Sequence, residues 1–397
     1  MEVIGSLTSS VLLDGKLTLL VASLVGFCTY YLTNAVKRPN LWCGNPKFHD
    51  FLNQFVPVFS EKFWPTIWCF EARAQTVFAS LLRSRIAPIS YSREIFQLSD
   101  GGEVCLDWTE PTRFADSAPR PVVIFLPGLT GHSQSDYIKS LVKAALKVNA
   151  TAVVFNNRGR GGIGIKTPKT YCGACSLDFS EIVCYVRRKY PTSIVVAAGI
   201  SLGGLILGNY LATNGSKARI YLDAAMIVSV PWDVLKGTVS LEKPILNLML
   251  NRHLAGCLAQ SLDLVKHQFE TVDGKWNIEL ALAARTIREF DTHFTSKQFG
   301  FSDLEEYYKA ACLHDKIHRI KVPTLCLSAR DDPFQPDEAI PYEAAAKSDY
   351  VAIVATSRGG HIGFMEGFLP LRENYIDRVF AQYLQAIINK HDLLSKL

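Results

Sequence analysis

The sequence has little net charge and no long run of residues of one sign. Its 42 Lys and Arg residues nearly balance 37 Asp and Glu residues, which leaves a formal charge of +5 at pH 7. Proteins that bind nucleic acids usually gather basic residues into a patch or stripe. The scattered charge therefore argues against a nucleic-acid partner.

The ten cysteines lack the regular spacing of a disulfide framework or a zinc ribbon. A chain of 397 residues can bury a core large enough to be stable without disulfides. Cys172 and Cys175 form a Cys-x-x-Cys pair, and no second pair follows at a spacing suited to zinc. We therefore expect neither a structural metal nor a redox pair.

A glycine pattern typical of dinucleotide-binding proteins lacks the context that it needs. Gly159, Gly161 and Gly164 fit G-x-G-x-x-G after an apolar stretch, but that motif must lead directly into a helix. Here the motif leads to Pro168, without any apolar periodicity. We therefore expect no dinucleotide-binding site here.

One stretch without charge lies near the N-terminus. Leu17 to Leu32 contains no charged residue, and residues 33–36 extend it to the ~20 residues that a membrane-spanning helix needs. Tyr30 and Tyr31 lie near its end, where interfacial aromatic residues are typical. A cleavable signal peptide would begin with positive charge and end with small residues, and this stretch fits both poorly.

We therefore predict a single-pass membrane anchor over residues 1–40, followed by a connector over 41–90. The localisation that this implies is a membrane, with the endoplasmic reticulum or a related internal membrane preferred. A buried core helix is the alternative interpretation of the apolar stretch. Lys37 and Arg38 follow the stretch, and by loop charge they favour a cytosolic position for the rest of the chain.

Short apolar runs alternate with helical patterns from residue 91 to the C-terminus. A hairpin is predicted over 93–98 and 104–108, turned by Ser99-Asp-Gly-Gly102. Buried strands are predicted at 121–126, 151–156, 194–198, 225–230, 324–328 and 351–355. Helices are predicted at 70–83, 178–190, 202–211, 338–347 and 371–389.

This alternation predicts a mainly parallel sheet that is covered by helices on both faces. Between Trp232 and Val322 the strand pattern stops and amphipathic helical sequence replaces it. We therefore predict one domain over 91–397 that carries a helical lid inserted at about 232–322.

The residues around Ser201 have the pattern Gly-x-Ser-x-Gly at a predicted strand-to-helix junction. A nucleophile at so sharp a turn has strained backbone angles, so the residues two before and two after it must be small. Gly199 and Gly203 occupy those two positions. The pattern predicts that Ser201 is a nucleophile and that the backbone N–H of Leu202 contributes to an oxyanion hole.

A nucleophilic serine needs a base, and the base needs a carboxylate that orients it. In chains with this elbow, the acid and the histidine follow the serine in that order. Asp332 and His361 each follow a late strand, and Asp332 directly precedes a proline in its turn. Asp332 is the preferred acid and Asp331 the alternative. The N–H of Leu129, after the strand at 121–126, is the expected second oxyanion donor.

Seven short stretches of the sequence together resemble one protein family. They are LPGLTG, NNRGRGG, GISLGG, REFD, GFSDLEEYY, ARDDPF and GGHIGF. With them the chain resembles, from about Ala87 to its C-terminus, the AB hydrolase superfamily and within it the AB hydrolase 4 family. The resemblance implies an α/β-hydrolase fold, a triad of Ser201, Asp332 and His361, and no metal or organic cofactor. The N-terminal stretch resembles the anchors of animal members, which typically have a type II arrangement.

The resemblance also implies ester hydrolysis on lipids. We expect a membrane-anchored serine hydrolase of acyl esters, acting on phosphatidylcholines with medium-length or oxidised acyl chains as some family members do. Transfer of the acyl group to a small alcohol is the alternative, because no motif decides whether water or alcohol reaches the acyl-enzyme. A non-catalytic lipid-binding scaffold is a more distant alternative. The expected partners are a lipid ester and a membrane, without an obligate protein partner.

The predicted lid contains groups whose roles the sequence leaves open. Arg288 is expected to pair with Glu289 within the lid, or Asp291 to attach the lid to the sheet. Ile245 and the stripe at 249–250 are expected either to pack inside the lid or to line a substrate channel, with packing preferred.

Overall fold

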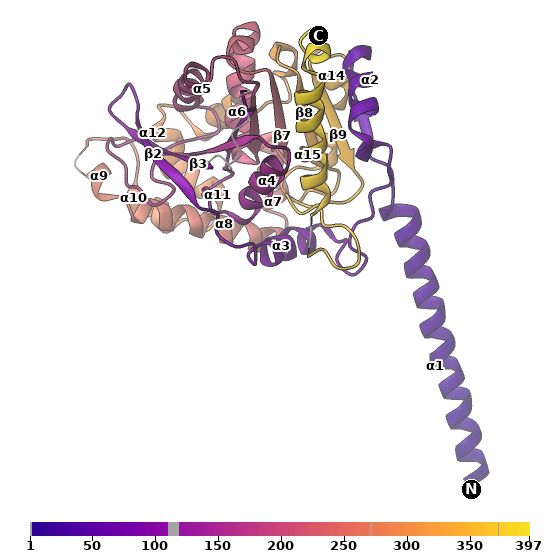
Figure 1. The fold of residues 1–397 in the computed structure, drawn as a ribbon. Helices are drawn as coiled ribbons and strands as arrows, with labels where there is room; N and C mark the ends of the chain where they lie inside the picture. Colours follow the sequence, from indigo (N-terminus) through magenta and orange to yellow (C-terminus); the bar gives the residue numbers. More distant parts are fainter. Residues whose placement is uncertain (1, 110–118, 271, 372) are drawn as a thin grey trace.

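A nine-stranded sheet in the order β1-β9-β8-β7-β6-β4-β5-β3-β2 runs through the body of the molecule (Figure 1). The computed structural model describes residues 2–109, 119–270, 272–371 and 373–397, with side chains from residue 15 onward. The strands are β1 (Asn40–Trp42), β2 (Tyr91–Gln97), β3 (Glu103–Thr109), β4 (Val122–Leu126), β5 (Thr151–Asn156), β6 (Val195–Ile200), β7 (Ala224–Val228), β8 (Thr324–Ala329) and β9 (Val351–Thr356).

Six central strands, β5, β4, β6, β7, β8 and β9, run parallel to one another. Most of their residues are apolar, because the strands lie between two layers of helices and are buried on both faces. All five residues of β4 are buried, for example. The six predicted buried strands are confirmed, and so is the hairpin, which forms β2 and β3 as an antiparallel pair.

Helices cover both faces of the sheet. On one face lie α4 (Asp136–Lys147) and α15 (Tyr375–Asn389), and the ring of Phe380 packs 5.5 Å from that of Phe125 in β4. On the other face lie α5 (Leu177–Lys189) and α6 (Leu202–Asn214). These four helices confirm the fold class expected from the alternation of strands and helices.

The helix predicted at 338–347 is wrong in extent. The chain there forms a short turn at Asp337–Ala339 and then α14 (Tyr342–Ala345). Pro341 lies between the two and lacks the N–H that a continuous helix would need. The interruption leaves β8 and β9 joined by a mostly irregular crossover.

The N-terminal helix projects away from the body, as Figure 1 shows for α1 (Glu2–Tyr30). It continues through a π-helical turn at Tyr31–Ala35. Within it, the 21 residues Gly15–Ala35 are long and apolar enough to cross a membrane, and only 6% of the apolar window is buried by the protein. The alternative of a buried core helix is therefore wrong.

The connector between this helix and the hairpin contributes more to the body than the sequence indicated. It contains α2 (Pro46–Phe55) and α3 (Ala72–Arg83), and the helix predicted at 70–83 corresponds to α3. It also contains β1, which pairs antiparallel with β9 and forms one edge of the sheet. Because β1 has three residues only, it offered no alternating pattern to detect.

Between β7 and β8 the chain forms helices, and no strand occurs among the described residues of 229–323. The helices are α7 (Val234–Leu241), α8 (Leu246–Asp263), α9 (His267–Glu270), α10 (Ile278–Leu282), α11 (Ile287–Phe290), α12 (Ser296–Gln298) and α13 (Leu304–Ala311). The insert is helical, as the sequence indicated. The final short helix of the chain is α16 (His391–Leu394).

Candidate active site

Ser201 lies at the sharp junction between β6 and α6, with φ 55° and ψ −117°. Such angles are strained for a residue with a side chain, and the turn is tight enough to require glycine on both sides. A Cβ added to Gly199 would lie 2.5 Å from the carbonyl oxygen of Gly203. A Cβ added to Gly203 would lie 2.0 Å from the carbonyl oxygen of Leu126 in β4. The two glycines therefore allow the turn that presents Ser201.

Replacing Gly203 with alanine is expected to lower the free energy of unfolding by about 4 kcal/mol or more, because backbone atoms of β4 occupy the new methyl position. Urea unfolding followed by circular dichroism measures this change. Gly256→Ala in α8 is the matched control, since its Cβ would meet nothing within 4 Å and should stabilise the helix slightly. Equal unfolding midpoints for the two variants would contradict the close approach at Gly203.

The structure brings Ser201, His361 and Asp332 together in one chain of hydrogen bonds. His361 Nε2 lies 2.9 Å from Ser201 Oγ, and His361 Nδ1 lies 2.9 Å from Asp332 Oδ2. His361 and Asp332 are 7% and 4% exposed, so the pair is largely shielded from water. In this arrangement Nδ1–H donates to the carboxylate, and Nε2 is left to accept the serine proton.

Asp332 and Asp331 have different neighbours, although they are adjacent in the sequence. Asp332 Oδ1 also accepts a hydrogen bond from the N–H of Phe334 at 2.8 Å, and the Phe334 ring stacks on the His361 imidazole with centroids 4.0 Å apart. Asp331 instead accepts from the N–H of Gly360 at 3.0 Å, and burial raises the pKa of its carboxyl to about 7. The geometry therefore favours Asp332 as the partner of His361.

Helix α3 of the connector holds the loop that carries His361, a contact that the sequence analysis did not predict. The N–H of His361 donates to Thr76 Oγ1 at 2.9 Å. Arg83 donates to the carbonyl of Gly363 at 2.7 Å, and Gln75 Oε1 accepts from the N–H of Met365 at 3.0 Å. These contacts join segments about 285 residues apart.

One signal for these contacts was present in the sequence. Gln75 and Arg83 lie on the same buried stripe of α3 as Ala72 and Ala79. A long polar residue on an otherwise apolar stripe usually has a specific partner inside the protein. Their partners in the histidine loop could not be identified from the sequence alone.

Leu129 and Leu202 line the same cavity as Ser201. Leu202 directly follows the serine, and Leu129 follows Gly128, where an added Cβ would lie 3.2 Å from Ser201 Cβ. The loop is fixed by Tyr137, whose hydroxyl accepts from the N–H of Gly128 at 2.9 Å. Among the described residues, neither leucine N–H donates a hydrogen bond to another group of the protein. Both are therefore free to bind a negatively charged oxygen.

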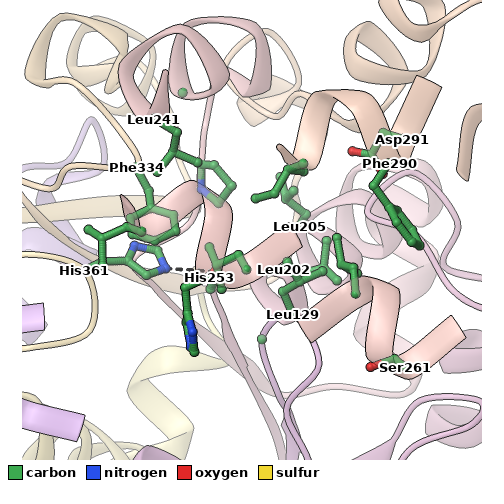
Figure 2. Close-up of a pocket in the computed structure, with 18 of the residues that line it drawn as sticks. Leu129, Leu202, Leu205, Leu241, His253, Ser261, Phe290, Asp291, Phe334 and His361 are labelled. Carbon is green, nitrogen blue, oxygen red and sulfur yellow. Dashed lines mark hydrogen bonds between the residues drawn. The ribbon is translucent and has the colours of Figure 1, made fainter. Parts of the chain in front are cut away.

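A cavity of about 880 Å³ opens onto Ser201 and His361. Figure 2 shows Phe334 beside His361, Leu241 next to Phe334, and Phe290 and Asp291 at some distance across the cavity. Most of the lining is apolar and comes from α3, α6 and the helices of the insert, including α8. The cavity suits a long apolar group whose polar end lies at Ser201.

Several side chains of the insert have other contacts than the sequence analysis expected. Residues 249–250 line the cavity rather than pack inside the insert, and Ile245 is exposed. Arg288 pairs with Glu242 at 2.6 Å and not with Glu289. Asp291 accepts a hydrogen bond from the Tyr308 hydroxyl at 3.1 Å, within the insert rather than to the sheet. Burial raises the pKa of the Asp291 carboxyl to about 7.

Two sequence motifs and one residue cluster lie outside the hydrogen-bonded series of Ser201, His361 and Asp332. The glycines at 159–164 lie in a loop between β5 and α5, as the sequence predicted. Cys172 and Cys175 are both free thiols. Asp233, Cys312 and His314 could together offer three ligand atoms within 4.8 Å of one another. Each of these three already makes a hydrogen bond to nearby backbone, so we assign no metal to them.

A serine at a glycine elbow, a buried histidine and an acid on successive strand ends define the α/β hydrolases. The family model described as "alpha/beta hydrolase fold" matches residues 121–368, which is more than half of the chain. The chain belongs to this family.

Individual relatives match between 80% and 96% of this chain. The chain is 39% identical over 383 residues to "Phospholipase ABHD3" of Homo sapiens, covering 96% of this chain and 92% of that protein. It is 31% identical to "Putative esterase YheT" of Escherichia coli (strain K12), covering 82% and 93%. It is 25% identical to "Medium-chain fatty acid ethyl ester synthase/esterase 2" of Saccharomyces cerevisiae, covering 80% and 85%.

Proposed function

We propose that this protein is a membrane-anchored phospholipase that cleaves acyl esters of phosphatidylcholines with medium-length or oxidised acyl chains. Its family and its phospholipase and esterase relatives make the chain a carboxylic ester hydrolase. The observation that carries the proposal is the hydrogen-bonded series of Ser201, His361 and Asp332 at one end of an apolar cavity.

In the proposed first step, Ser201 Oγ attacks the ester carbonyl while His361 Nε2 accepts its proton. Asp332 keeps Nδ1 protonated and stabilises the positive imidazolium that results. The carbonyl oxygen becomes negatively charged and accepts hydrogen bonds from the N–H groups of Leu129 and Leu202. These two donors are fixed by the backbone before substrate binds, so little reorganisation is needed.

The attack of Ser201 produces a tetrahedral intermediate. When it collapses, the bond between the former carbonyl carbon and the leaving oxygen breaks. His361 gives its proton to that oxygen, which leaves as the alcohol of a lysophospholipid, and the acyl group remains on Ser201. A water molecule then transfers a proton to His361 and attacks the acyl carbonyl. Release of the fatty acid returns the proton to Ser201 Oγ.

The arrangement of the chain supports a membrane lipid as the source of the substrate. In this proposal residues 1–40 anchor the protein to the endoplasmic reticulum or a related internal membrane. Residues 41–90 connect the anchor to the hydrolase domain at 91–397, and the insert at about 232–322 covers the cavity. The apolar cavity would keep the acyl chain out of water during both steps.

Hydrolysis by the purified full-length protein in phosphatidylcholine vesicles tests the proposal. We expect release of free fatty acid from lipids with eight- to ten-carbon chains, measured by mass spectrometry with and without added ethanol. Fatty acid ethyl ester as the main product would instead support acyl transfer, the activity that the name of the yeast relative includes. Lipid binding without any ester cleavage would support a scaffold.

A further inference from the structure

An exposed apolar surface surrounds the mouth of the cavity. Its members are large hydrophobic residues, each between 43% and 74% exposed. They come from the connector, the start of α8 and the loop before α15. We call them the portal surface: Trp64, Trp68, Val77, Phe78, Leu81, Ile245, Leu246, Met249, Phe368 and Leu369.

Hydrogen bonds and ring contacts join the three parts of the portal surface. Trp68 Nε1 donates to the carbonyl of Phe368 at 2.7 Å, and its ring meets that of Phe78 edge-on at 6.0 Å. Arg73 Nε of α3 donates to Asn247 Oδ1 of α8 at 2.8 Å. The exposed apolar residues are therefore held next to one another, although they are far apart in the sequence.

Four members of the portal surface also line the cavity that contains Ser201. They are Val77, Leu81, Leu246 and Met249. All four are about half exposed or more, so they form the rim at which the cavity meets its surroundings. An acyl chain moving between α3 and α8 would touch apolar side chains from the outside of the protein to the catalytic serine.

The membrane anchor leaves the body on the same side. Figure 1 shows α1 projecting from the edge of the body along which α3 and α8 lie. The Phe70 ring of the connector packs 5.8 Å from Phe27 and 5.7 Å from Tyr31 of the N-terminal helix. Ala35 is the last residue of the apolar segment Gly15–Ala35. Phe27 lies eight residues before it, which is roughly 12 Å along the helix axis. If that segment crosses a bilayer, this part of the connector lies at the depth of the bilayer interface.

We propose that the portal surface docks on the lipid bilayer, so that phospholipid enters the cavity laterally between α3 and α8 without passing through water. The inference rests on the proposed membrane anchoring. Large exposed apolar patches mark interaction sites, and tryptophan is favoured at membrane interfaces. A bilayer is the occupant because the anchor continues directly into this surface through Phe70 and Trp64, whose ring lies 6.5 Å from that of Tyr31.

Quenching of Trp68 fluorescence by brominated phosphatidylcholine tests the docking without any need for activity. The full-length protein is placed in vesicles with and without bromine on the acyl chains, and Trp68→Phe supplies the reference spectrum. The emission that depends on Trp68 should fall at least about twofold in bromolipid. Flotation of the vesicles shows whether the protein is bound to them. If the protein floats with the vesicles but Trp68 is not quenched, the portal surface does not dock on the bilayer. If the protein does not float with the vesicles, the proposed membrane anchoring is contradicted.

A kinetic test addresses the entry route. Phe78→Ser/Phe368→Ser/Leu369→Ser changes portal residues that do not line the cavity. We expect kcat/KM on vesicle phosphatidylcholine to fall about tenfold, and kcat/KM on a short-chain soluble ester to be unchanged. Ile220→Ser changes an exposed residue in the turn at Gly215–Ile220, before β7, and should change neither value. Unchanged vesicle hydrolysis by the triple variant would contradict the route, whereas a wild type that cleaves only the soluble ester would contradict the phospholipase proposal.

Discussion

Ser201→Ala is expected to lower kcat for ester hydrolysis by about 10⁴- to 10⁶-fold, because the variant lacks the atom that attacks the carbonyl. The protein should remain folded. A Cβ is already accommodated at this strained position, and among the described residues the Ser201 hydroxyl forms a hydrogen bond only with His361. Turnover of a chromogenic ester, with circular dichroism of the same sample, measures both properties.

Ser261→Ala is the matched control for this substitution. Ser261 also lines the cavity, but it lies away from His361 and bonds to Arg160 instead (Figure 2). Its kcat should remain within about threefold of wild type, since the hydroxyl is not aligned with a base. More than a tenth of wild-type turnover in Ser201→Ala would mean that another group performs the attack.

Asp332→Asn is expected to lower kcat by about 10³- to 10⁴-fold. The amide removes the negative charge that stabilises the imidazolium of His361. It can also donate a hydrogen bond to Nδ1, which would place the ring proton on Nε2 and prevent that atom from accepting the proton of Ser201. Steady-state kinetics with a soluble ester measure the loss, and unchanged thermal unfolding would show that the fold is retained.

Asp331→Asn separates the two adjacent acids. Burial raises the pKa of Asp331 to about 7, so its carboxyl is already partly neutral near physiological pH. An amide oxygen can still accept the hydrogen bond from Gly360. We expect less than a tenfold loss of kcat. A larger loss in Asp331→Asn than in Asp332→Asn would reverse the assignment of the acid.

Much of the fold could be predicted because its physical causes are local. Parallel strands buried on both faces appear as continuous apolar runs, and six such runs became β4 to β9. The sharp turn at Ser201 could be predicted because glycine occupies the positions two residues before and two residues after it. The order of the acid and the histidine after the serine follows from where strands end, and in the structure His361 contacts Ser201 and Asp332 contacts His361.

The features that the sequence did not reveal depend on contacts between distant segments. β1 is too short to show an alternating pattern of apolar and polar residues. Its pairing with β9 joins residues more than 300 positions apart in the sequence. Thr76 and Arg83 support the histidine loop through its backbone N–H and C=O groups, which every residue type except proline provides. The stripe in α8 looked like packing because apolar residues that line a cavity have the same pattern as residues in a core.

The most direct test of the central claim is covalent capture of Ser201 by a fluorophosphonate probe in the membrane-extracted protein. The account predicts that wild type is labelled on the tryptic peptide that contains Ser201. Labelling should be absent in Ser201→Ala and should fall at least about a hundredfold in rate in His361→Ala, because the serine then lacks its base. A well-folded wild type that is not labelled, or is labelled on another residue, would contradict the claim that Ser201 is an activated nucleophile.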